Sequence, residues 1–138
     1  MTKLSPVGII FITKLLKGSI AMIDLFPDVT GLFDPQDVKL NRFKSIPAYI
    51  SVFFFVPVIF SQNSPFAKFH ANQGFGLFII GVIKELLFEF LLPHTLIFSI
   101  VGWVISLAVF TLSLVGLCSA AAGKATEIPL VCKIRVFK

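Results

Sequence analysis

Charged side chains are scarce in this sequence. Only 14% of its 138 residues are Asp, Glu, Lys or Arg, whereas 57% are hydrophobic, and the mean hydropathy is +0.96. A soluble domain carries about a quarter charged residues. The scarcity excludes an ordinary soluble domain. It indicates an integral membrane protein of a bacterial plasma membrane or of an organellar inner membrane.

Residues that carry chemistry are also few. The two cysteines form no CxxC pair, and the two histidines, His70 and His94, have no further ligand at metal spacing. No glycine-rich phosphate loop, nucleophile elbow or HExxH motif is present. Glu85 and Glu89 lie one helical turn apart, but such carboxylates usually reach the headgroups rather than relay protons. We therefore expect no enzyme, no metal and no cofactor. The basic residues are scattered, so nucleic acid is not expected as a partner.

The stretch Ser64–Leu92 predicts the helix around which the chain is organised. Ser64 is a favourable N-cap, Pro65 fits the first turn, and Pro93 ends the helix at a Pro93–His94 turn. At about 1.5 Å per residue this helix is roughly 40 Å long, whereas a hydrocarbon core needs about 30 Å. We expect residues 66–73 at the interface and residues from Gly74 onward in lipid.

One face of that helix collects polar residues. His70, Gln73, Lys84 and Glu85 fall on this face at 100° per residue. A lysine or carboxylate at membrane depth costs roughly 3 kcal/mol, so it normally turns inward and finds a partner. This polar helix face is predicted to contact a partner protein or to line a polar path.

The helix predicted over residues 95–123 carries a stripe of small residues. Such stripes let membrane helices approach closely. We expect a helix-packing seam between this stripe and the glycines of the preceding helix. Trp103 is expected to fill the bundle. The seam comprises Gly74, Gly81, Ser99, Gly102, Ser106, Ser113, Gly116 and Ala120.

Two further helical regions complete the prediction. One starts with Asp34 as the N-cap and Pro35 in the first turn, and it leads into a span. Residues 46–60 form a short span that Pro47 and Pro57 kink, with Tyr49 as an interfacial ring. Residues 6–26 form an amphipathic helix that lies in the membrane plane or, alternatively, is a fourth span. Lys14 and Lys17 make that fourth span expensive. The fold class is thus all-α, a membrane bundle of three clear spans plus an N-terminal helix.

The basic residues bear on topology. The predicted divisions are an N-terminal helix and link (1–33), a transmembrane bundle (34–123) and a basic tail (124–138). Three spans place the tail and a basic collar near residues 39–44 on opposite sides, whereas four spans fit the positive-inside rule better. The tail either lies on lipid headgroups or is disordered. Its headgroup contacts are predicted to be Lys124, Lys133, Arg135 and Lys138.

Three phrases carry a family resemblance: DPQDVKLNRFKSIPAYISVFFFVPVIF, SPFAKFHANQGFGLFI and AAAGKATEIPLVCKIRVFK. They resemble small bacterial multi-span membrane proteins of unknown function, which are distantly similar to the Tic-type channel subunit of chloroplast inner-envelope protein import. The resemblance covers residues 34–138, and Phe69–Gly74 is its most specific part. The chain departs from that pattern at Cys132, Lys84 and Glu85. The family has no established catalytic residues, so none are carried over.

The predicted function is that of a non-enzymatic membrane subunit that packs against other membrane proteins. The resemblance implies polypeptide translocation or transport as the setting, by analogy only. The alternative is a small channel or transporter made by self-association, with the polar helix face lining the path. The expected partners are the lipid bilayer and other membrane subunits or a second copy.

Overall fold

The computed structural model describes residues 5–91 and 95–138, without the side chains of residues 18–25. The described part is mostly helical, with irregular chain over residues 123–138, and its one β-type pairing is a bridge between Asp28 and Thr126. The predicted Pro93–His94 turn lies outside the described residues. In chain order the elements are α1 (Pro6–Leu25), η1 (Thr30–Leu32), α2 (Pro35–Ser45), η2 (Ile46–Tyr49), η3 (Ser51–Phe54), α3 (Phe55–Phe60), α4 (Pro65–Glu85), η4 (Leu86–Leu91) and α5 (Leu96–Ala122).

Local sequence sets the helix ends. Asp34 accepts a hydrogen bond from the Gln36 amide, and Ser64 accepts one from the Ala67 amide at 3.0 Å, so both predicted N-caps are confirmed. At its other end α5 stops at Gly123, whose φ of +72° is the left-handed conformation that glycine adopts most easily. The all-helical class is therefore confirmed.

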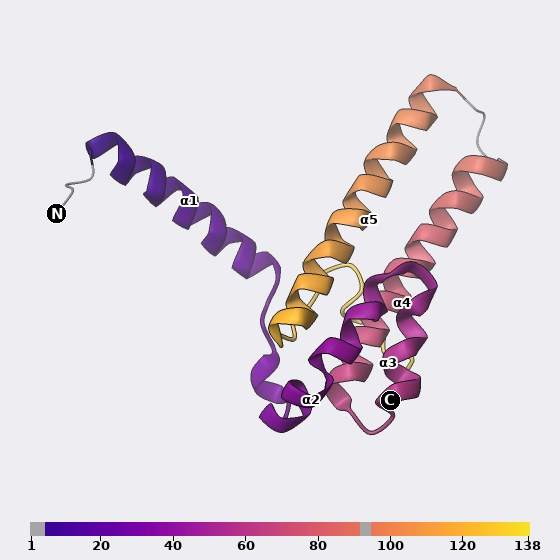
Figure 1. Cartoon of the computed structure of the whole chain (residues 1–138). Coiled ribbons are helices and arrows are strands. Elements are labelled where there is room, and N and C mark those ends of the chain that lie inside the picture. Colours follow the sequence, from indigo (N-terminus) through magenta and orange to yellow (C-terminus); the bar gives the residue numbers. More distant parts are fainter. Residues whose placement is uncertain (1–4, 92–94) are drawn as a thin grey trace.

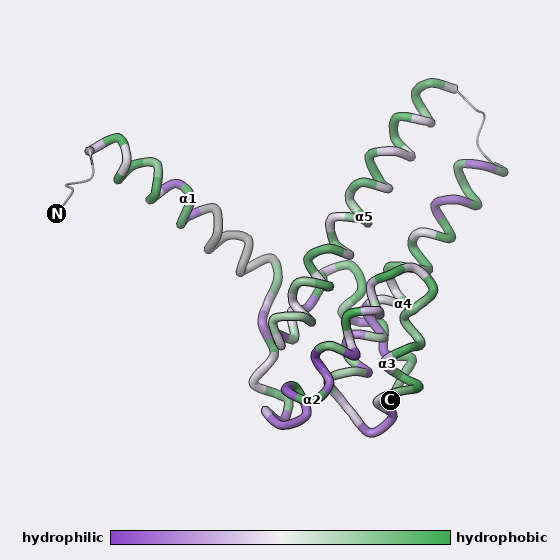
Figure 2. Tube along the Cα trace, viewed as in Figure 1, coloured by the Kyte–Doolittle hydropathy of each residue, from purple (hydrophilic) through white to green (hydrophobic). Residues whose placement is uncertain are grey.

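Helices α4 and α5 lie side by side and extend together from the body of the molecule (Figure 1). Their distal halves expose large apolar side chains, including Ile83, Leu86, Trp103 and Leu107. In Figure 2 the trace is mostly hydrophobic along both helices, with hydrophilic positions in the distal part of the α4 arm. Within the described ranges, α5 is the one helix long and apolar enough to cross a membrane. Trp103 was predicted to fill the bundle, but 78% of it is exposed, so that prediction is wrong.

Residues 46–60 fold back on themselves instead of forming a continuous helix, and we call them the 46–60 hairpin. Ser45 donates to the Asn41 carbonyl at one end, and Ser61 donates to Asn41 Oδ1 at 2.7 Å at the other. Both ends thus meet at one residue of α2. The reversal falls at Ser51, whose φ is +44°.

The predicted span over residues 46–60 is therefore not observed. Fifteen helical residues cover only about 22 Å, less than a bilayer core. Pro47 and Pro57 also limit the helix from within, because each removes a backbone donor. The expected kink becomes a full reversal between the two prolines. Tyr49, predicted to be interfacial, is buried.

The two basic clusters share one end of the molecule. Figure 1 places α2, which carries Lys39, Arg42 and Lys44, at the same end as the C-terminal residues. The predicted three-span bundle, which put these clusters on opposite sides, is not confirmed, because the 46–60 hairpin returns to the end where it began.

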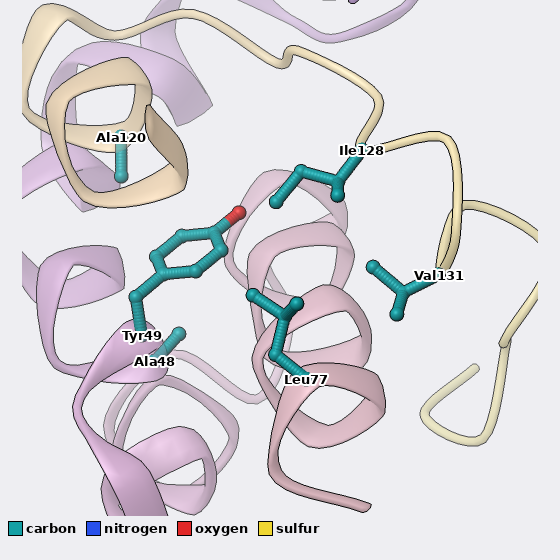
Figure 3. Close-up of a cluster of buried hydrophobic side chains, with 6 residues drawn as sticks. All are labelled: Ala48, Tyr49, Leu77, Ala120, Ile128 and Val131. Carbon is teal, nitrogen blue, oxygen red and sulfur yellow. The ribbon is translucent and has the colours of Figure 1, made fainter. Parts of the chain in front are cut away.

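The core lies at this same end. Six buried side chains form it: Ala48, Tyr49, Leu77, Ala120, Ile128 and Val131 (Figure 3). The Tyr49 ring lies between α4 and α5, and a Cβ at Gly116 would overlap it. The tail residues Ile128 and Val131 are fully buried. The tail thus completes the core, so neither predicted form, a surface-lying segment or a disordered one, describes it fully.

Candidate functional site: a buried polar hub and an open polar groove

The first half of α4 buries a group of hydrogen-bonded polar side chains, which we call the polar hub. It comprises Tyr49, His70, Asn72, Gln73, Ser119 and Thr126. Five of the six are buried, and Thr126 is half-buried. The hub therefore joins η2, α4, α5 and the tail at one point.

Tyr49 and His70 form the centre of the hub. The Tyr49 hydroxyl lies 2.7 Å from His70 Nδ1 and donates to Gln73 Oε1 at 3.1 Å. A phenol has one proton, so in this arrangement the hydroxyl accepts the Nδ1 proton of His70. His70 Nε2 is buried without a hydrogen-bond partner among the described residues, although the Lys124 backbone lies near the ring.

Gln73 and Ser119 extend the hub to the start of the tail. Gln73 Nε2 donates to the Thr126 carbonyl at 3.1 Å. Ser119 Oγ lies 2.7 Å from Thr126 Oγ1 and 2.8 Å from the Lys124 carbonyl. Through these bonds α4 and α5 both fix the chain directly after α5.

Asn72 holds the far end of the tail. Its Oδ1 accepts from the amides of Val136 and Phe137, both at 2.7 Å, and its Nδ2 donates to the Phe137 carbonyl at 2.9 Å. A single amide side chain thus pairs with the backbone as a neighbouring strand would. The tail is seated on α4 by this contact.

At Gly74, η2 makes its closest approach to the backbone of α4. A Cβ at this position would overlap the Ala48 carbonyl, so η2 can pack directly on the helix backbone. The predicted seam placed Gly74 against the helix over 95–123, but its partner is η2. Gly81, predicted to be part of the same seam, faces open space.

The α5 part of the seam meets several neighbours. Gly116 lies against the Tyr49 ring, and Gly102 lies against the Phe88 ring, 3.3 Å from where a Cβ would stand. Ala120 is buried in the core, and Ser106 contacts Lys84. Ser99 and Ser113 line cavities between the helices.

The second half of the site is a groove between the distal parts of α4 and α5, which we call the polar groove. Lys84 Nζ lies 2.5 Å from Glu85 Oε1 and 2.8 Å from Ser106 Oγ. One cavity of about 310 Å³ lies beside this pair, and Glu89 also lines it. An adjoining cavity of about 430 Å³ runs toward Ser51 at the tip of the 46–60 hairpin.

The structure divides the predicted polar helix face in two. His70 and Gln73 are buried and bonded inside the chain, whereas Lys84 and Glu85 border the groove. The four residues do not form one continuous surface. The four predicted headgroup contacts are all exposed at the basic end: Lys124, Lys133, Arg135 and Lys138.

Sequence reasoning missed four members of the hub: Tyr49, Asn72, Ser119 and Thr126. It also missed that Asp37 accepts from the Phe66 amide at 3.1 Å, which adds a second cap to α4. Polar residues at the closely spaced positions 70, 72 and 73 were the available signal. Asn72 points away from the face that His70 and Gln73 share, so these residues require partners in two directions and not a single lipid-averted face.

Asp28 anchors the link before α2. Hydrogen bonds from the Thr30 hydroxyl and amide hold the pKa of this carboxyl below its usual value, and nearby Lys124 lowers it further. The link is then tied to the tail, because the Val29 amide donates to the Ala125 carbonyl at 2.8 Å. These contacts are structural.

Little in this arrangement resembles a reaction centre. The hub is closed, and its groups are used by one another. Within residues 5–91 and 95–138, no group of three His, Cys, Asp or Glu side chains is placed to hold a metal ion. The arrangement consists of the polar hub, which is an internal hydrogen-bonded network, and the polar groove, which is open and partly charged.

Comparison with known proteins assigns the family. No family model matches the chain, and no solved structure matches it. Magnetosome protein MmsF of Paramagnetospirillum magneticum is 33% identical over 88 residues, which are 61% of this chain and 75% of that protein. Magnetosome protein MamF of Magnetospirillum gryphiswaldense is 31% identical over 87 residues, 61% and 72% of the two chains.

These relatives overturn the predicted resemblance. The matching proteins are named magnetosome proteins and not Tic-type import channel subunits. The phrases that prompted that resemblance include residues 69–74, and three of these, His70, Asn72 and Gln73, belong to the hub and are bonded inside the chain. With the apolar α5 helix and these relatives together, the protein is membrane-associated. The chain belongs to the family of the magnetosome proteins MmsF and MamF.

Proposed function

We propose that the chain is a non-enzymatic, integral protein of a magnetosome-type membrane and that it binds a partner membrane helix in the polar groove. The observation that carries this proposal is the Lys84–Glu85–Ser106 contact. It lies between helices that otherwise expose mostly large apolar residues.

The membrane placement follows from where apolar side chains are exposed. We place the distal part of α4 with η4, and α5, across the bilayer as a helical hairpin. Phe53, Phe55 and Ile59 of the 46–60 hairpin are also exposed, at 48%, 42% and 54%. The 46–60 hairpin enters the leaflet at the basic end and returns to that end. Irregular backbone can lie at this depth where protein surrounds it. The basic end then lies at the headgroups on the cytoplasmic side.

In this placement the groove needs a partner. Lys84 is only 13% exposed, but Glu85 is 61% exposed at membrane depth. A charged group facing lipid costs roughly 3 kcal/mol, and a neighbouring helix with polar side chains removes part of that cost. The hub offers no comparable opening, since its side chains are buried.

The test is a pair of matched substitutions on α5. Ser106→Leu fills the groove and removes a Lys84 contact. Thr111→Leu makes the same kind of change on the outer face, where Thr111 bonds only the Leu107 carbonyl. Complexes extracted from native membranes in mild detergent are weighed by native mass spectrometry.

We expect Ser106→Leu to weaken the complex about five- to thirtyfold, since interhelical polar contacts contribute about 1–2 kcal/mol. Thr111→Leu should leave it intact. A hetero-complex lost only in Ser106→Leu supports a partner protein, and a homo-oligomer lost in the same way makes the partner a second copy. Equal assembly in both variants contradicts the proposal.

A further inference from the structure

A further cavity lies at the basic end and shares no lining residue with the two cavities of the polar groove. It measures about 530 Å³ and is formed by η1, the first turns of α4 and the tail. Three cations and three phenylalanines line it: Lys68, Arg135, Lys138, Phe33, Phe69 and Phe137. Among the described residues no Asp or Glu lines it. A hollow with cationic and aromatic walls but no acidic side chain among the described residues fits an anion with an apolar body.

The tail is held in place to form this cavity. Asn72 fixes the Val136 and Phe137 backbone, and Lys68 Nζ donates to the Lys138 carbonyl at 2.6 Å. Arg135 and Lys138 are exposed, so their charges are free to meet a ligand. The cavity is therefore formed without a ligand. Ligand binding then does not have to offset the entropic cost of ordering the tail.

The cavity also lies at a defined depth. The Phe137 ring contacts Phe54 of the 46–60 hairpin at 6.3 Å and Phe75 of α4 at 6.0 Å between centroids. Phe54 in turn packs on Phe75 and Phe78. This aromatic cluster joins the cavity to the elements that we place in lipid. The cationic side chains thus stand where the headgroup region begins.

We propose that this cavity binds the headgroup of an anionic phospholipid, with the phosphate between Arg135 and Lys138 and the upper acyl chain along Phe137. Guanidinium and ammonium groups donate charge-assisted hydrogen bonds to phosphate oxygens. The apolar walls favour a lipid over a free anion, because inorganic phosphate cannot use them. The proposal rests on the membrane placement given under Proposed function, but not on the groove or its partner.

The experiment uses the full chain in mild detergent, titrated with dioleoylphosphatidylglycerol or dioleoylphosphatidylcholine and followed by the shift in Tm. The test variant is Arg135→Gln with Lys138→Gln. The matched control is Lys44→Gln with Lys133→Gln, which removes the same charge from exposed residues that do not line the cavity. Inorganic phosphate is titrated in parallel.

We expect phosphatidylglycerol to raise Tm and phosphatidylcholine to do so much less. A cation near an anionic headgroup contributes about a fivefold gain in affinity, so the test variant should bind about 25-fold more weakly. The control should bind within about threefold of the natural sequence. Without lipid the two double variants should share one Tm, because all four side chains are exposed.

Three results would overturn the proposal. Equal losses in both double variants would mean general charge attraction rather than a site. Equal stabilisation by the two lipids would mean that the cavity does not recognise the negative charge of phosphatidylglycerol. Stabilisation by inorganic phosphate alone would assign the cavity to a soluble phosphate. Failure of the membrane placement itself is seen separately, as a chain that stays in solution without detergent.

Discussion

Polar side chains have opposite environments in the two halves of α4. In the first half His70, Asn72 and Gln73 are buried and bonded to groups of the same chain. In the second half Lys84 and Glu85 face a groove that the chain does not close. The helix has nine buried residues, and none lies beyond Leu77. A polar residue in an apolar helix is therefore explained by its partner and not by its position on a helical face.

The partners differ in distance along the sequence. Those of the hub residues on α4 come from 21 to 65 residues away, in η2 and in the tail. Lys84 finds its partners at the next residue and on α5, 22 residues away. Beyond α4, the polar side chains of the first half thus bond to η2 and the tail, whereas those of the second half bond to α5 alone and border an open groove. The predictions below test this contrast, from the largest expected effect to the smallest.

The two glycines of α4 should give the largest contrast. Gly74→Val forces a side chain into the Ala48 carbonyl, and such backbone overlap should cost about 3 kcal/mol or more of unfolding free energy. Gly81→Ala meets open space and gains helix propensity of up to about 1 kcal/mol. Thermal unfolding in mild detergent measures both. Similar losses at the two glycines would remove the contrast between the halves.

Asn72→Leu should give the next largest effect. It leaves the Val136 and Phe137 amides and the Phe137 carbonyl without their partner, at about 2 kcal/mol in total for these partly buried groups. Trypsin cleavage at Lys133 and Arg135 should become faster as the tail detaches. Gln62→Leu, at an exposed position beside α4, is the control. Unchanged cleavage in Asn72→Leu would show that the tail is held by other contacts.

Tyr49→Phe tests the centre of the hub at lower cost. It removes one hydroxyl and leaves His70 Nδ1 without its partner, for about 1–2 kcal/mol of unfolding free energy. In a cycle with Gln73→Leu, the two changes should cost less together than separately, with a coupling of about 1 kcal/mol. Additive losses would mean that the two side chains act independently.

The smallest effect concerns Asp28. Its pKa is lowered in the folded state, chiefly by Thr30, so it stabilises the protein above the unfolded pKa of about 4. That contribution declines as the pH falls through the lower folded pKa. Asp28→Asn should therefore lower Tm at about pH 6, and the difference should narrow at about pH 3. A pH-independent difference would mean that the carboxylate charge is irrelevant.

Much of the helical pattern could be predicted from local residues. Asp34 with Pro35 and Ser64 with Pro65 mark helix starts through short-range hydrogen bonds and fixed φ, and both starts are confirmed. The long apolar helix that ends at Gly123 follows from composition and from one glycine. These features depend on contacts within about four residues.

The 46–60 hairpin and the hub could not be predicted in this way. The hairpin returns because Ser61 reaches Asn41 and the Phe66 amide reaches Asp37, contacts between positions 20 and 29 residues apart. An apolar stretch with two prolines reads equally as a kinked span. Tyr49 was placed at the interface for the same reason, since its partners become visible only in the folded chain.

The hydrogen bonds that hold the tail on α4 also constrain the order in which this protein can fold. Asn72 and Gln73 lie on a helix that is synthesised well before the residues that satisfy them, which are Thr126, Val136 and Phe137. Until those residues leave the ribosome, the amide side chains of Asn72 and Gln73 remain open to water or to chaperones. Helices α4 and α5 can therefore form before the tail contacts that complete the hub, so these contacts are among the last steps of folding.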